Sequence, residues 1–403
     1  MESSKFQRQV RFILRFGKAL HAAGTPAHTL EGTMQELCQL MKIKGTFISQ
    51  PTGFFASFSN GEEEVTKIER VEPMGVNLGR LAHIDLISRE VISNTISYEE
   101  GYQKLEDVLN APEPFGKRIH ISYFLFSAAG FLVLFGGHWG DLVAAVAVGI
   151  LMGVLYIFKP IGPAYQMFEA IVAVVASLAT YLLAKLIPGL NVGVIILSSL
   201  IIFMPGVYIT LAIAEIATQN LVSGTARLVG GIMILLKLTF GVFIGSKLAS
   251  WFHFPSLDVS FEQIPVWVAL ITLPLTSLMS LVGFRGNRED WKWVMMAGIF
   301  GYLCSKVGAH FLGAELGMFF GGTCIGAMSN IFARLKNKPS SIFQFPGIIL
   351  LVPGSVGYRS MNFLFERDML GGLDTAFTMI ALAMALVVGL FFGNLIIKPR
   401  SSL

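Results

Sequence analysis

The sequence predicts a mainly α membrane protein, in which a small N-terminal α+β soluble domain precedes a ten-helix transmembrane bundle. Hydrophobic residues make up 54% of the 403 residues and charged residues only 14%, a composition unusual for a soluble globular protein. Of the 26 acidic residues, 15 precede His120, so the charge is concentrated in the N-terminal third. Beyond that point, most of the apolar runs reach the roughly 20 residues that span a bilayer.

The first 118 residues have the local patterns of a soluble α+β unit. Residues 5–20 place apolar side chains along one side and basic side chains along another, which predicts an amphipathic helix. The other elements expected here are a helix over 29–42, strands over 46–49, 54–59 and 65–71, and helices over 78–95 and from Ser97 to about 109. Asn60-Gly61 predicts a hairpin, Asn77 a helix cap, and Ser97 with Glu100 a capping box.

The charge and cysteine content limit the kinds of partner and cofactor expected for this domain. Its 14 Lys and Arg residues balance 15 acids, so nothing in its charge predicts nucleic-acid binding. The sequence start lacks the order of a signal peptide, and the domain is therefore expected in the cytoplasm. Three scattered cysteines predict neither a disulfide framework nor a metal site, and we expect no cofactor.

Ten apolar runs predict ten membrane spans, with nine and eleven as open alternatives, and the fourth and ninth runs contain a Pro-Gly pair. The runs cover residues 119–137, 141–158, 166–187, 190–212, 224–250, 264–284, 291–309, 314–333, 342–361 and 373–397. Basic residues in the loops gather on one side of a ten-span arrangement, with Arg359 and Arg367 as exceptions. The positive-inside rule then places both termini in the cytoplasm.

An internal repeat relates the two halves of the bundle. Residues 132–137 recur as 281–286 at an offset of 149, and Met204-Pro-Gly206 recurs as Val352-Pro-Gly354 at an offset of 148. Five spans per half is an odd number, so the second half is expected to cross the membrane in the opposite sense, as in many secondary transporters. The expected domains are 1–118, 119–253 and 264–400.

The two Pro-Gly pairs are the strongest candidates for a substrate site. Proline removes a backbone donor, so each helix is expected to break before Gly206 and Gly354. A helix that restarts inside a membrane directs unsatisfied N–H groups at a cavity, where they suit a carboxylate. The alternative is a proline kink that only shapes packing. Ser355 follows the second pair and offers a hydroxyl.

Charged residues in apolar surroundings are the other candidates. Glu215 is expected to pair with a substrate ammonium or to exchange a proton, or else to lie on a short interfacial helix. Lys237 is expected to face a cavity or an acid, unless a shifted span returns it to the interface. Glu169 and Glu315 lie near the starts of spans, where the helix dipole alone would stabilise them.

Nothing in the sequence predicts an enzyme. His83 and Asp85 lie two residues apart on one expected helix and so point in different directions, and Ser57 lacks the glycines of a nucleophile elbow. The sequence also has no phosphate-binding loop of the Walker type, which argues against ATP hydrolysis.

The segments Pro51-Thr-Gly53 and Arg70-Val-Glu-Pro-Met-Gly-Val-Asn-Leu-Gly-Arg-Leu81 resemble the N-terminal domain of the threonine/serine exporter family. The resemblance implies a cytoplasmic domain joined to ten spans in two halves. It also implies proton-coupled export of a small amino acid across the plasma (inner) membrane. Related proteins are linked to dicarboxylate export, and a hydrolase-like role has been suggested for the family's N-terminal domain.

The expected partners are therefore a small-molecule substrate and the lipid bilayer. A secondary transporter that exports threonine or serine is the first hypothesis, a dicarboxylate (succinate-like) exporter the second, and a membrane-anchored hydrolase the third. A channel and a homo-oligomer both stay open.

Overall fold

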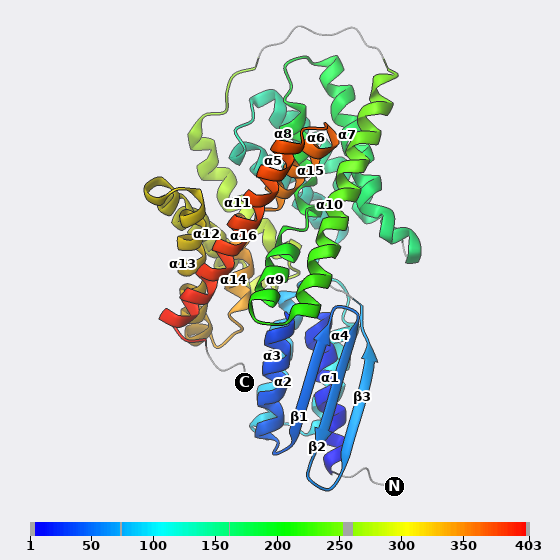
Figure 1. Cartoon of the computed structure of the whole chain (residues 1–403), viewed down its shortest axis with the longest axis vertical. Helices are drawn as coiled ribbons and strands as arrows, with labels where there is room; N and C mark the ends of the chain where they lie inside the picture. Colours follow the sequence, from blue (N-terminus) through cyan, green and yellow to red (C-terminus); the bar gives the residue numbers. More distant parts are fainter. Residues whose placement is uncertain (1–4, 73–74, 161, 253–260, 400–403) are drawn as a thin grey trace.

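A computed structural model describes residues 5–72, 75–160, 162–252 and 261–399, and it places an N-terminal domain at one end of a helical bundle (Figure 1). The domain boundaries expected at residues 253 and 400, and the Met74 of the family-like segment, lie outside the described residues. The elements of the N-terminal domain are α1 (Lys5–Ala22), α2 (Ala27–Leu40), β1 (Lys44–Gln50), β2 (Gly53–Ser59), β3 (Glu64–Arg70), α3 (Leu78–Ile92) and α4 (Tyr98–Asn110).

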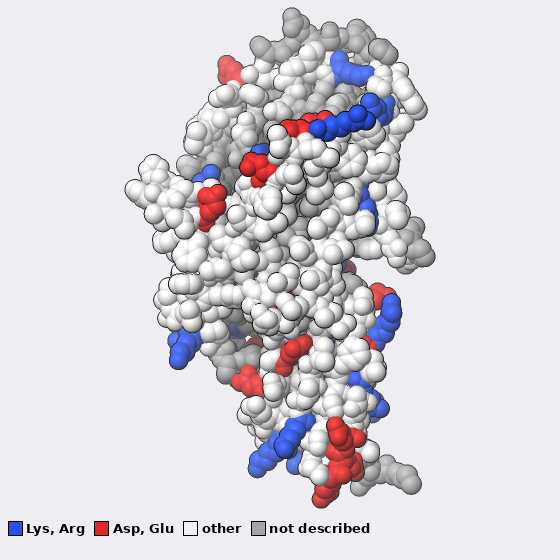
Figure 2. All heavy atoms as spheres, viewed as in Figure 1, with Lys and Arg blue, Asp and Glu red and all other residues white. Residues whose placement is uncertain are grey.

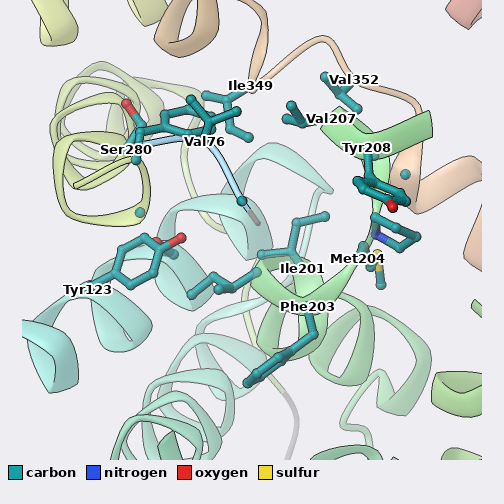
Figure 3. A pocket seen from close by; sticks show the side chains of 18 of the residues that line it. Val76, Tyr123, Ile201, Phe203, Met204, Val207, Tyr208, Ser280, Ile349 and Val352 are labelled. Atoms are coloured by element: carbon teal, nitrogen blue, oxygen red, sulfur yellow. The ribbon is translucent and has the colours of Figure 1, made fainter. Parts of the chain in front are cut away.

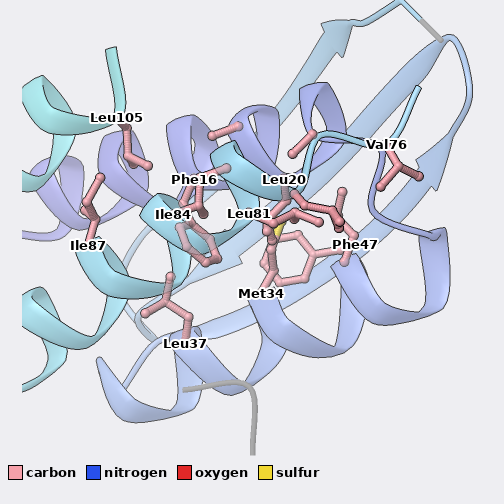
Figure 4. Packing of buried hydrophobic residues seen from close by; sticks show 14 of the residues in the cluster. Phe16, Leu20, Met34, Leu37, Phe47, Val76, Leu81, Ile84, Ile87 and Leu105 are labelled. Carbon is pink, nitrogen blue, oxygen red and sulfur yellow. The ribbon is translucent and has the colours of Figure 1, made fainter. Parts of the chain in front are cut away.

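The N-terminal domain is a three-stranded antiparallel sheet packed on helices. Strand β2 lies between β1 and β3, and Phe54, Ala56 and Phe58 alternate into the core, as the period of two along a strand requires. Side chains of α1, α2 and α3 complete this core (Figure 4). The hairpin expected at Asn60 is present, because its side-chain oxygen accepts the backbone amides of Glu62 and Glu63.

Two helix starts are fixed by the caps that the sequence predicts. The Asn77 side chain accepts the amide of Arg80 at 2.9 Å, so α3 begins at Leu78. Ser97 and Glu100 form the reciprocal bonds of a capping box at the start of α4. These local signals explain why the element boundaries of this domain are readable from the sequence.

The bundle contains two series of helices in the same order. The first series is α5 (Lys117–Leu134), α6 (Trp139–Ile157), α7 (Phe168–Leu186), α8 (Val192–Leu200), α9 (Gly206–Ala217) and α10 (Leu221–Ser250). The second is α11 (Ala269–Gly283), α12 (Trp291–Leu312), α13 (Ala314–Lys336), α14 (Ser341–Ile348), α15 (Gly354–Phe365) and α16 (Met369–Ile396).

Eight or nine of the ten expected spans are recognisable from helix length and apolar character. In the described ranges, eight helices are long and apolar enough to cross a membrane, and a ninth crossing results if the bent pair Val192–Phe203 and Gly206–Ala217 is one span. The corresponding pair, α14 and α15, does not reach this criterion. Five residues, 349–353, separate its two helices, whereas only Met204 and Pro205 separate Phe203 from Gly206. The structure therefore supports eight or nine spans, where the sequence predicts ten.

Within each series, helices pack against each other at glycines that occupy matching positions. A side chain added at any of these glycines would meet a neighbouring helix at the same point in each series. The matched contacts are Gly149 on Ala128 and Gly298 on Ser277, Gly224 on Ile216 and Gly372 on Leu364, Gly241 on Ala170 and Gly389 on Phe319, and Gly245 on Val174 and Gly393 on Thr323. Because every pair keeps the 148 or 149 offset, these contacts follow the register of the sequence repeat.

The surface divides into charged and uncharged zones. Acidic and basic side chains gather over the N-terminal domain at the lower end, and the surface of the bundle between the two ends is largely uncharged (Figure 2). Many large apolar side chains are exposed on bundle helices, among them Leu270, Phe311 and Phe377. An exposed apolar belt of this kind identifies the bundle as the membrane-embedded part of the protein.

The N-terminal domain is joined to the bundle by a continuous core. Leu211, Phe284 and Phe345 of the bundle belong to the same buried cluster as the domain's own core residues. The first amides of α3 also bond across the junction, from Leu78 to the Phe284 oxygen at 2.9 Å and from Gly79 to the Arg285 oxygen at 3.1 Å. The domain is therefore docked on the bundle rather than connected to it only by its linker.

Candidate functional site

Both Pro-Gly pairs interrupt a helix in the same way. Helix α9 begins at Gly206 after Pro205, whose φ and ψ are −80° and 36°, and α15 begins at Gly354 after Pro353, with −81° and 32°. At the first break, the helices Val192–Phe203 and Gly206–Ala217 are bent by 57° relative to each other. The first amide of α9 with an acceptor one turn back is that of Ile209, which bonds the Pro205 oxygen at 2.9 Å. The amides before it have no acceptor within their helix.

The two breaks lie against each other. A Cβ atom built on Gly206 would lie 3.1 Å from the Gly354 nitrogen, and one built on Gly354 would lie 3.1 Å from the Gly206 Cα. Distances this short leave no room for a side chain at either position. The crossing of the two broken helices therefore requires glycine at both.

A cavity of about 390 Å³ opens beside this crossing, and we call it the break cavity (Figure 3). Both glycines line it, together with the linker residues before α9 and α15. Its hydrogen-bonding side chains come from helices of both series: Tyr123, Ser127, Tyr156, Tyr208, Thr276 and Ser280. The N-terminal domain adds Gly24, Gly75 and Val76, so one wall of the cavity belongs to the docked domain.

Charged side chains reach the break cavity from two helices of the first series. Glu169 at the start of α7 lines the cavity and pairs with Lys237 at 3.4 Å, while the Lys237 Nζ also donates to the Gln166 oxygen at 2.7 Å. Arg227 on α10 lines it as well and lies 5.5 Å from the Tyr208 ring centre. Arg285, in the turn after α11, lines the cavity too, which thus offers an acid, two guanidinium groups and neutral donors.

Glu215 lies apart from the breaks, at the far end of α9. Its side chain is fully buried and accepts from Ser223 at 2.8 Å, Arg227 at 3.1 Å and the backbone amide of Ala27 at 2.9 Å. Ala27 is the first residue of α2, which has no side-chain cap of its own. Glu215 therefore caps a helix of the N-terminal domain, in a position closer to the interfacial alternative than to a substrate site.

The structure brings together some of the sequence candidates and separates others. Gly206 and Gly354 line the break cavity, whereas Glu215, Lys237 and Ser355 are not among its lining residues. Each of the two charged candidates instead holds a residue that does line it, since Glu215 binds Arg227 and Lys237 binds Glu169. Ser355 is half-buried on α15.

Arg227 is the residue that the sequence analysis misses. The signal for it was present, because an arginine within the apolar run 224–250 is as unusual as the glutamate at 215. Pairing between the two could not be read from their separation of twelve residues, since a turn divides α9 from α10. No cluster of three or more His, Cys, Asp or Glu suited to a metal occurs in the described part of the chain.

Comparisons with known proteins agree with a membrane carrier. A family model described as "Putative threonine/serine exporter" matches residues 11–249, and one described as "Threonine/Serine exporter, ThrE" matches residues 270–396. No solved structure matches the chain significantly.

The similarity to fungal proteins extends over nearly the whole chain. An uncharacterized protein of Schizosaccharomyces pombe is 25% identical over 98% of this chain and 56% of its own length. Pheromone-regulated membrane protein 10 of Kluyveromyces lactis is 27% identical over 98% of this chain and 44% of its own length, and its namesake in Candida albicans is 27% identical over 98% and 38%. The chain thus spans about half the length of these relatives or less. Since the two family models cover most of the chain, the protein belongs to the threonine/serine exporter family.

Proposed function

We propose that this protein is a secondary transporter that exports a small zwitterionic amino acid, such as threonine or serine, in exchange for protons. The observation that carries the proposal is the break cavity, where free helix amides, two guanidinium groups and one carboxylate surround a space of about 390 Å³. Family membership supports the transport class, and the chemistry of the cavity supports the kind of substrate.

A zwitterion needs two partners of opposite character, and the cavity supplies both. The amides at the starts of α9 and α15, with Arg227, suit a carboxylate, because a helix N-terminus carries a partial positive charge. Glu169 suits an ammonium group. The tyrosine, serine and threonine hydroxyls of the lining would recognise a hydroxyl on the substrate side chain.

We assign the proton-exchanging role to Glu169 in preference to Glu215. Glu215 already accepts three hydrogen bonds, one of them from the N-terminal domain, and is fully buried. Glu169 is partly exposed, lines the cavity and has Lys237 as its one charged partner among the described residues. An acid that faces the cavity can release a proton to the same space that the substrate leaves.

We further propose that the two halves, α5–α10 and α11–α16, are inverted repeats that cross the membrane five times each. The matched glycine contacts and the two Pro-Gly breaks support equivalent construction, and an odd number of crossings requires opposite sense. In this arrangement, α14 and α15 form a broken fourth crossing of the second half, like that of α8 and α9 in the first. Rocking of one half against the other would expose the break cavity alternately to each side.

Transport by reconstituted protein tests the proposal. Proteoliposomes that contain labelled threonine, serine or succinate are given an imposed pH gradient, and efflux is followed with time. We expect threonine and serine to leave faster when the protons enter, whereas succinate efflux stays at the level of empty liposomes. Faster efflux of succinate would favour dicarboxylate export, for which Arg227 and Arg285 in the lining are the supporting feature.

The Glu169→Gln variant separates coupling from binding in the same assay. We expect threonine exchange across the membrane to continue while the response to the pH gradient is lost, because glutamine cannot carry the proton. Glu315→Gln is the matched control, since Glu315 also lies in the first turn of a helix and lines neither cavity described here. An unchanged pH response in Glu169→Gln would remove Glu169 from the mechanism.

We also propose that the protein lies in the plasma membrane with the N-terminal domain in the cytoplasm. The basic loops of the bundle support this orientation. A cysteine at position 62, in the exposed turn after β2, tests it in a variant without the native cysteines. We expect an impermeant maleimide to label it only from the cytoplasmic side, and labelling of intact cells from outside would reverse the orientation.

A further inference from the structure

We propose that the protein has a second small-molecule site, in a cavity between the N-terminal domain and the bundle, that binds a neutral amphipathic molecule carrying an amide or hydroxyl group. The cavity measures about 590 Å³, larger than the break cavity. Helices α1, α2 and α3 form one side, and α9, α13, α14 and α16 form the other. We call it the interdomain cavity.

Three polar atoms of residues that line this cavity are buried and have no hydrogen-bond partner. They are Thr25 Oγ1, His28 Nδ1 and Thr210 Oγ1, among seven such side-chain atoms in the part of the chain that the structure describes. Thr25 is 6% exposed and Thr210 is 2% exposed. An unmet hydrogen bond of a buried group costs about 1–3 kcal/mol, so a ligand that supplies all three bonds gains a substantial advantage.

The three groups come from both sides of the domain junction and are held in place by it. Thr25 and His28 flank Ala27, whose amide binds the Glu215 carboxylate on α9 at 2.9 Å. Thr210 lies on the same helix, α9, five residues before Glu215. The Glu215 cap thus fixes the distance between the two sides of the site. A bound molecule would touch both the N-terminal domain and the helix that restarts at Gly206.

The charges of the lining argue against an ionic ligand. Two acids, Glu36 and Asp85, and one base, Lys338, line the cavity. Lys338 already donates to Glu289 at 2.6 Å and to Asp290 at 2.7 Å, and Asp85 pairs with Arg89. Lys338 is therefore already neutralised by two acids and offers little attraction to an anion.

The buried end of the site is neutral. Burial lowers the pKa of His28 below its ordinary value, and the neighbouring Glu215 charge offsets this only in part, so the imidazole is uncharged at neutral pH. The two threonine hydroxyls are neutral as well. Leu211, Ile348 and Leu390 supply apolar lining. A charge placed among such groups would lose its hydration without compensation, whereas an amide or hydroxyl would find its bonds.

Ligands of equal size and different charge test this site. Benzamide, benzoate and benzylammonium are titrated separately against the purified full-length protein in detergent, with binding followed by saturation-transfer NMR. We expect benzamide to bind saturably and the two ions to bind at least tenfold more weakly. Threonine should not displace benzamide, because the break cavity is a separate space.

Isosteric variants locate the binding. We expect Thr210→Val and, on the opposite side, Thr25→Val each to weaken benzamide binding about tenfold, while the melting temperature shows that each variant is folded. Thr239→Val is the control, since Thr239 is equally buried on α10 and lines neither cavity. It should leave the affinity unchanged.

Three results would overturn the proposal. Tighter binding of either ion would refute the neutral class, and unchanged benzamide affinity in both threonine variants would refute the location. No saturable binding of any of the three molecules would show that the cavity holds only water, which can also satisfy buried polar groups.

Discussion

Gly206→Val and Gly354→Val are each expected to abolish transport while the protein still inserts into the membrane. A side chain at either position would enter the crossing of α9 and α15, where the nearest backbone atoms of the other glycine lie 3.1 and 3.2 Å from a Cβ. Backbone cannot move aside as a flexible side chain can, so the two helix starts must separate. The Cγ atoms of valine extend beyond the Cβ and enlarge the required shift, and a misplacement of about 1 Å can cost a hundredfold in rate.

Transport of labelled threonine into proteoliposomes, with protein content matched by immunoblot, measures this effect. Gly193→Val is the control, because a Cβ at that position meets only the Asn191 side-chain oxygen, at 3.7 Å. It should transport at near the normal rate. Normal transport by both Gly206→Val and Gly354→Val would mean that the crossing shapes packing and has no part in the substrate site.

Glu215→Ala is expected to destabilise the protein by about 3–5 kcal/mol, the usual loss when one partner of a buried ion pair is removed. The side chains of Arg227 and Glu215 are 6% and 0% exposed, so the variant would leave a buried guanidinium without its carboxylate. It would also uncap α2 at Ala27. Thermal unfolding in detergent and the rate of proteolysis between the domain and the bundle both report this loss.

A double variant distinguishes the ion pair from general packing. Glu215→Leu combined with Arg227→Met should be more stable than Glu215→Ala, because two apolar side chains replace the unpaired charge. Glu315→Ala serves as a control, since this exposed acid has no ion pair in the described residues. An unfolding temperature of Glu215→Ala equal to that of the natural protein would contradict the docking role.

The N-terminal domain was predictable because its signals are local. Asn77 caps the helix that begins at the next residue, and Ser97 and Glu100 reach each other across a single turn. The alternation of Phe54, Ala56 and Phe58 identifies a strand with one buried face. Each of these patterns fits within a few residues, so no knowledge of the rest of the fold is needed.

The docking of this domain could not be predicted, because it depends on contacts between distant parts of the chain. The carboxylate that caps α2 belongs to Glu215, which is 188 residues further along. The amides of Leu78 and Gly79 bond to carbonyl groups of the turn after α11. Every residue has a backbone carbonyl, so these hydrogen bonds cannot be predicted from the residue types.

The helix breaks of the candidate site were predictable from the sequence, whereas only some of its side chains were. The two Pro-Gly pairs located both helix breaks, since proline and glycine act through the backbone of their own segment. Arg227 and Glu169 reach the cavity through the packing of α10 and α7. Glu215 and Lys237 were predicted as site residues because they are charged residues in apolar surroundings. Their charged partners, Arg227 and Glu169, are the residues that line the cavity.

The central claim is that the break cavity holds the exported amino acid between the two restarted helices. A cryo-electron microscopy structure of the protein in lipid nanodiscs with saturating threonine tests it most directly, with a structure without threonine as the reference. We predict density for one molecule beside Gly206 and Gly354, with its carboxylate toward the free amides and its ammonium toward Glu169. Threonine bound elsewhere in the bundle, with the break cavity unchanged between the two structures, would contradict the account.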